Sequence, residues 1–101
     1  MELELIAGTE QKIKIGDNDL ILSPIRVKEM INIERYAREN KLAMNSIEMM
    51  AYTVAQGLRK NGTTFEQVQE MSMDELRKIS ETLDKISFPP TQETEENKQS
   101  G

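Results

Sequence analysis

Two aspartates beside a glycine are the closest that this sequence comes to a metal-binding pattern. Asp17 and Asp19 lie on either side of an asparagine, directly after Gly16. Calcium loops of the EF-hand type place oxygen ligands at this spacing, but they also need a glycine at the sixth position and a glutamate at the twelfth. Counted from Asp17, the sixth position is Leu22. We therefore interpret the segment as a tight turn, and we assign no metal and no cofactor to the chain.

The residues that enzymes use most often are missing. The sequence contains no histidine and no cysteine, which removes the commonest general base, the commonest transition-metal ligand and all thiolate chemistry. Glycine-rich phosphate-binding motifs do not occur in it. One helical segment carries charges of alternating sign, as is typical of a solvated face with weak ion pairs: Glu34, Arg35, Arg38 and Glu39. We therefore expect that this protein is not an enzyme.

Methionines form the most suggestive group of side chains. The chain has seven, and most of them cluster around the ends of predicted helices: Met44, Met49, Met50, Met71 and Met73. Methionine adapts its shape and is common on surfaces that bind variable partners. The alternative role is filling of the core, which we assign to Met30 and Met50. The other four predict an exposed patch that binds another protein.

Three further side chains extend this predicted patch. Tyr52 lies off the apolar stripe of its helix, and tyrosine is favoured at interfaces. Tyr36 falls on an edge of the stripe of the preceding helix. Leu42 belongs to an apolar connector, which is either tucked under the domain or used for contact, because connectors are usually polar. The predicted protein-binding residues are Tyr36, Leu42, Met44, Met49, Tyr52, Met71 and Met73.

The elements that must position these side chains begin with a β-hairpin at about 11–22. Apolar and polar residues alternate there with a period of two, which predicts strands with one buried face. Gly16-Asp17-Asn18 supplies the tight turn between them. A similar alternation at Leu3 and Leu5 extends the hairpin into a small meander. Ser23-Pro24 ends the strands, because proline cannot continue the hydrogen-bond ladder.

Helical periodicity follows the strands, and it predicts helices over about 27–40, 46–60, 64–70 and 72–86. Asn45 or Ser46 caps the second helix, and Thr64 and Ser72 cap the next two. Ser72 and Glu75 have the spacing of a capping box. The apolar stripe of the second helix contains Ile47, Met50, Ala51, Val54 and Leu58. The predicted fold is therefore α+β and mostly helical, with an N-terminal antiparallel hairpin or meander followed by three or four short helices.

The last part of the chain has a different composition. Pro89-Pro90 forbids further helix, and residues 91–101 contain no large apolar side chain. Such a segment is too polar to offset the entropy lost on ordering. We predict one small domain over 1–88, with Phe88 docked on its core, and a disordered polar tail or linker over 89–101.

The charge balance limits the classes of partner. The net charge of −5 gives no gain from counterion release on nucleic acid, and it disfavours an anionic membrane surface. The opening residues MELELIAG lack the basic region and the apolar run of a signal peptide. We therefore expect a cytoplasmic protein that binds neither nucleic acid nor membrane.

The overall arrangement resembles a known family. A strand hairpin, KIKIGDNDLIL, leads through SPIRVKEM into a helix, and the step TTFEQVQEMSMDELRKISETL follows the second helix and Gly62. This order of elements, over about 11–87, is similar to that of the small tail assembly chaperones of long-tailed bacteriophages and prophages. The similarity is one of pattern and length, since the family has no sharp motif.

The resemblance implies a function without catalysis in the cytoplasm of the bacterial host. Such chaperones bind the phage tape measure protein and keep its helical segments from aggregating during tail assembly. A longer form, made by a translational frameshift, recruits tail tube subunits in this family. We expect the same client for this chain, and we also expect a homo-oligomer.

Two other functions compete with this hypothesis. A structural component of the virion, in the tail or at the head–tail connector, could assemble through the open edge of the hairpin. An acidic regulatory protein that mimics nucleic acid is the third possibility. The acidic and basic residues are interspersed, however, so the sequence predicts no continuous acidic face.

Overall fold

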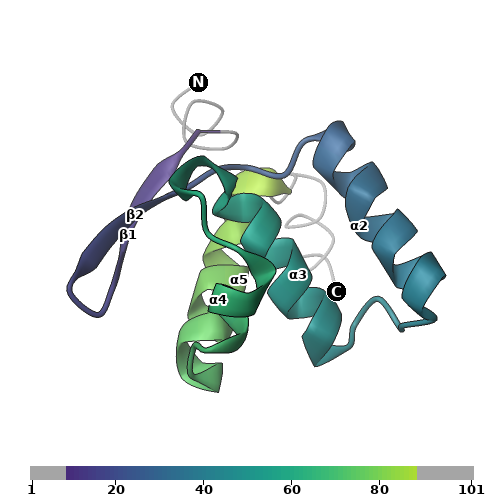
Figure 1. Cartoon of the computed structure of the whole chain (residues 1–101). Helices are drawn as coiled ribbons and strands as arrows, with labels where there is room; N and C mark the ends of the chain where they lie inside the picture. Colours follow the sequence, from purple (N-terminus) through teal and green to yellow (C-terminus); the bar gives the residue numbers. More distant parts are fainter. Residues whose placement is uncertain (1–8, 89–101) are drawn as a thin grey trace, which may run out of the picture.

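The computed structural model describes residues 9–88, which form a two-stranded hairpin followed by helices (Figure 1). The predicted strand around Leu3 and Leu5 and the predicted tail over 89–101 lie outside the described residues. Within them, the α+β and mostly helical fold is confirmed.

The hairpin consists of β1 (Gln11–Ile15) and β2 (Asn18–Leu22), which pair antiparallel. Ile15 is opposite Asn18, so the loop between the strands contains only Gly16 and Asp17. Gly16 has a φ of 60°, in the left-handed region that such two-residue turns require. The predicted turn is confirmed, and the two aspartates need no other explanation.

Four α-helices and one 3₁₀ turn follow within residues 9–88. They are α2 (Val27–Asn40), α3 (Ile47–Gly57), η1 (Arg59–Asn61), α4 (Phe65–Gln69) and α5 (Met73–Ser87). Figure 1 shows α3 between α2 and the pair of α4 and α5, and α3 contacts all three. Helix α3 is shorter than the predicted helix over 46–60, because the chain leaves the α conformation at Leu58, directly after Gly57.

The helix ends follow the capping residues of the sequence. The hydroxyls of Ser46 and Ser72 accept hydrogen bonds from amides three residues later, at 3.2 Å and 3.1 Å. A complete capping box forms at Thr64: its hydroxyl accepts from the Gln67 amide, and its own amide donates to the Gln67 side-chain oxygen. These caps make Ile47 and Met73 the first residues of α3 and α5.

The core lies between β2, α3 and α5. Its largest fully buried apolar side chains are Leu22, Ile33, Met49, Val54, Leu58, Val68 and Leu83. Helices α3 and α5 approach closely at Gly57, where a Cβ atom would lie 2.9 Å from both terminal methyl carbons of Leu83. A larger residue at position 57 would therefore displace the buried Leu83 side chain.

Three predictions of burial are wrong. Met49 is completely buried, although it lies off the stripe that we identified. The reason is that α3 is covered by neighbours on more than one side. Ile47 belongs to that stripe but is 57% exposed, because no neighbouring helix covers the first residue of α3. Phe88 does not dock on the core: it is 56% exposed, beyond the end of α5. Met30 and Met50, assigned to the core, are half-buried against it.

Candidate protein-binding groove

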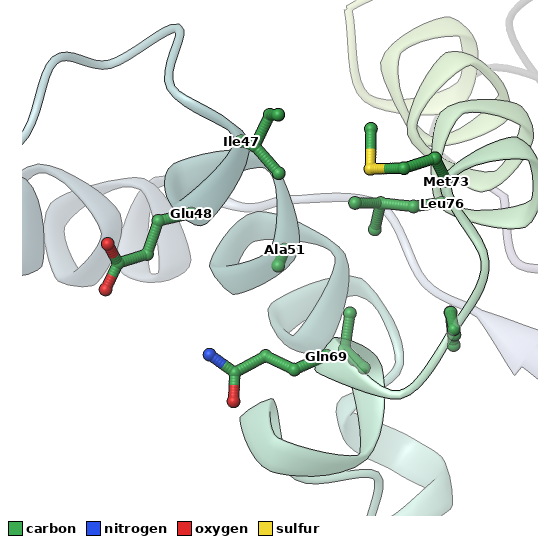
Figure 2. A pocket seen from close by; sticks show the side chains of 8 residues that line it. Ile47, Glu48, Ala51, Gln69, Met73 and Leu76 are labelled. Atoms are coloured by element: carbon green, nitrogen blue, oxygen red, sulfur yellow. The ribbon is translucent and has the colours of Figure 1, made fainter.

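A hollow of about 400 Å³ opens between the first turns of α3 and α5 and the end of α4 (Figure 2). We call it the α3–α5 groove. Most of its lining is apolar, and the lining residues are Ile47, Glu48, Ala51, Val68, Gln69, Met71, Met73 and Leu76. Its volume falls in the range of roughly 300–1,000 Å³ that is usual for binding pockets.

The two walls of the groove come from residues at equivalent places in their helices. Ile47 and Met73 are each the first residue after a serine cap. A side chain at this position has no earlier helical turn to pack against, so it extends beyond the end of the helix. Ile47 is 57% exposed and Met73 is 39% exposed. Figure 2 shows the two side chains on opposite sides of the hollow.

The floor of the groove is part of the core. Ala51, Val68 and Leu76 are all buried and belong to the same cluster as the central side chains. Ala51 is the smallest of them, and its single methyl group leaves the space that a larger residue would fill. The groove is therefore an apolar hollow with a rigid floor.

The rim is polar on one side. The side chains of Glu48 and Gln69 both point to the side away from α5 (Figure 2). Both residues are exposed, and Glu66 precedes Gln69 by one turn on the same helix. An apolar floor with a polar rim is the usual arrangement of a surface that binds a protein segment.

An aromatic cluster lies beside this rim and joins three helices. The rings of Tyr36 and Tyr52 stack with centroids 4.1 Å apart, and Phe65 meets both edge-on at 5.8 Å and 5.6 Å. Burial raises the pKa of the Tyr36 hydroxyl, and the nearby Glu48 carboxylate raises that pKa further. The hydroxyl donates a long hydrogen bond to Glu48, at 3.5 Å. The cluster therefore packs α2 and α4 against α3, next to Glu48 at the rim.

The structure divides the predicted binding residues among separate places. Met71 and Met73 line the α3–α5 groove. Tyr36 and Tyr52 form the aromatic cluster, and Leu42 packs partly buried against the core. A second hollow, of about 240 Å³, has Met44 and Met49 among its lining residues. Met44 is 49% exposed there, whereas the predicted exposure of Met49 is wrong because the residue is fully buried.

Apart from Met71 and Met73, the residues that line the groove were not predicted from the sequence, and the most exposed of them is Ile47. The helical periodicity assigned Ile47 and Ala51 to a core stripe. It did not indicate that Val68 of α4 lies beside them in the folded chain. One feature of the sequence could have identified Ile47: it directly follows the predicted cap Ser46, so it is the first residue of its helix, where no earlier turn covers it.

The sequence also gave no indication that Glu29 would be buried. Its carboxylate is 4% exposed and accepts a bond from the Arg26 guanidinium at 2.6 Å. The Nε atom of Arg59 lies 3.5 Å from the same oxygen. Hydrogen bonding to Arg26, together with the charge of Arg59, lowers the pKa of Glu29 to about 2 despite its burial. This ion pair fastens the start of α2 to η1 and lies apart from the α3–α5 groove.

Two kinds of feature are absent from residues 9–88. None of the helices in that range has the length and apolar composition that a membrane crossing requires. No three acidic, histidine or cysteine side chains gather there as ligands for a metal ion. Comparison of the chain with models of known families, with curated proteins and with solved structures found no match.

Proposed function

We propose that this protein is a phage or prophage tail assembly chaperone, which binds helical segments of the tape measure protein and keeps them soluble. The observation that carries the proposal is the α3–α5 groove. Ile47 and Met73 are exposed on its two walls above a buried apolar floor. Exposed apolar side chains around a hollow mark sites where a partner covers them.

A helix is the partner that this groove fits best. An amphipathic helix presents apolar side chains at intervals of three and four residues, and one or two of them fill a hollow between two other helices. Methionine suits this task because it adjusts to client side chains of different shape. Met71 and Met73 supply that adjustable part of the lining.

The identity of the client rests on the resemblance to the tail assembly chaperones. In that family the client is the tape measure protein, and a longer frameshifted form recruits the tail tube protein. We propose the same client for this chain, in the cytoplasm of the bacterial host, with no catalysis and with self-association into a homo-oligomer.

The competing proposal of a virion subunit has less support. Its assembly through the hairpin requires free backbone groups along the strand edges. At Ile21 of β2, the side chain of Asn61 accepts from the amide at 2.9 Å and donates to the carbonyl at 2.7 Å. Two residues later, the amide of Ser23 donates to the Gly57 carbonyl at 2.7 Å. The end of the β2 edge is therefore already used within the molecule.

Coexpression with the tape measure protein of the same locus tests the proposal. We expect the client to be largely insoluble alone, and to be recovered in a soluble complex when this chain is present. The complex should copurify through size-exclusion chromatography. A client that is equally soluble and unassociated without this chain would contradict the proposal. Presence of the chain in purified virions at fixed stoichiometry would favour the virion subunit instead.

A further inference from the structure

The charges around the α3–α5 groove are one-sided. Glu48 is the single charged residue among those that line it. Glu66 lies on the same side, because it precedes the lining residue Gln69 by one turn of α4 and therefore shares its face of the helix. Both carboxylates are exposed, and neither takes part in a salt bridge between residues 9 and 88. The α3–α4 wall of the groove is therefore acidic and available to a cation.

The α5 wall differs from it. Asp74 forms an ion pair with Lys78 at 3.2 Å, so its charge is largely balanced within the same helix. Met73 forms the apolar part of this wall, and the exposed Arg77 follows one turn later. Glu75, the other acidic residue in the first turn of α5, lines a different hollow. Among the residues that line the groove itself, negative charge is therefore found on the α3 side only.

We propose that the groove selects amphipathic helices that carry lysine or arginine along one flank of their apolar ridge. This inference rests on the proposed function and specifies the chemistry of the client segment. Ridge side chains fill the apolar hollow, and the basic flank faces Glu48 and Glu66. Because the acidic residues lie on one side of the groove only, this charge contact also determines the N-to-C direction in which the client helix lies along the groove.

Three synthetic helical peptides with the same leucine and methionine ridge test this selection. One carries lysines on a single flank, the second carries glutamates at the same positions, and the third carries glutamines. We expect the lysine peptide to bind at least tenfold more tightly than the glutamate peptide at low salt, measured by fluorescence anisotropy. The glutamine peptide should lie between them, and the difference should shrink as salt is raised.

A charge-reversed protein provides the matched control. Glu48 and Glu66 are exposed, so the double variant E48K/E66K should fold, which its circular dichroism spectrum will check. In this variant we expect the order of the lysine and glutamate peptides to reverse. If the folded variant binds the glutamate peptide more tightly than the lysine peptide, the result will support charge selection by Glu48 and Glu66.

The possible failures are distinguishable. Equal binding of all three peptides would overturn the charge selection and leave the groove as a purely apolar site. Preference for the lysine peptide that is unchanged in E48K/E66K would also overturn it, because the cation would then be recognised elsewhere. Absence of binding by every peptide would overturn the proposed function together with this inference.

Discussion

Replacing Met49 with aspartate is expected to leave the domain unfolded at 25 °C. Met49 is fully buried, at 0% exposure, and its amide also donates to the cap of α3. Loss of a buried methionine side chain costs about 2–5 kcal/mol, and burial of an unpaired carboxylate adds to that. The total stability of a domain of this size is only about 5–15 kcal/mol. Far-ultraviolet circular dichroism and urea titration will measure the loss.

Met44 provides the matched control for this substitution. It is also a methionine near the start of α3, but it is 49% exposed, so M44D should change the free energy of unfolding by less than about 1 kcal/mol. A folded M49D variant with near-native stability would contradict the burial of Met49. It would also favour the role in a binding surface that the sequence predicts for this residue.

Acid is expected to weaken the fold through Glu29. Its pKa is about 2 in the folded protein, compared with the ordinary value of 4.5. Below pH 4.5 the unfolded chain therefore binds a proton that the folded chain does not, so stability falls as the pH falls. The contribution of Glu29 is fully present above about pH 4.5 and is lost by about pH 2. A shift of this size corresponds to roughly 3 kcal/mol.

The variant E29Q isolates this effect. In the native protein the Arg26 amide donates to Glu29 at 2.9 Å, and a glutamine oxygen can still accept this bond. Glutamine cannot form the ion pairs with Arg26 and Arg59. We expect E29Q to be about 2–3 kcal/mol less stable at pH 7, with a much flatter loss of stability between pH 4.5 and 2. Urea titrations at several pH values will compare the two proteins. Parallel curves would mean that other carboxylates cause the acid sensitivity.

Much of the fold could be predicted because its signals are local. The alternation of side chains over 11–22 and the glycine at 16 fix the hairpin, while the serine and threonine caps fix where three helices begin. These features depend on residues within one turn of each other. The shortened second helix was not predicted, because its apolar stripe continues to Leu58, whereas the chain leaves the α conformation there and enters the 3₁₀ turn η1.

The site could not be predicted in the same way, because it depends on how helices meet. An analysis of a single apolar stripe assumes that a helix is covered on one face. Helix α3 contacts α2, α4 and α5, so Met49 is buried off that stripe while Ile47 on the stripe is exposed. Likewise, the contact of the Glu29 carboxylate with Arg59, 30 residues later in the chain, depends on the fold and not on local sequence.

The central claim is that the α3–α5 groove holds the client helix, and two exposed isoleucines allow a controlled test of it. Ile47 lies on the groove and is 57% exposed, whereas Ile31 of α2 is 50% exposed and is absent from the groove lining. Aspartate at the first position of a helix is favourable for the helix dipole, so I47D and M73D should both fold. The comparison therefore separates loss of the groove from loss of the fold.

The decisive measurement is the dissociation constant of a helical tape measure segment for the native protein, I47D/M73D and I31D, by isothermal titration calorimetry. We predict that I47D/M73D binds at least tenfold more weakly than the native protein, while I31D stays within about twofold, with all three folded. Equal affinity of I47D/M73D and the native protein would contradict the claim, because the client would then bind outside the α3–α5 groove.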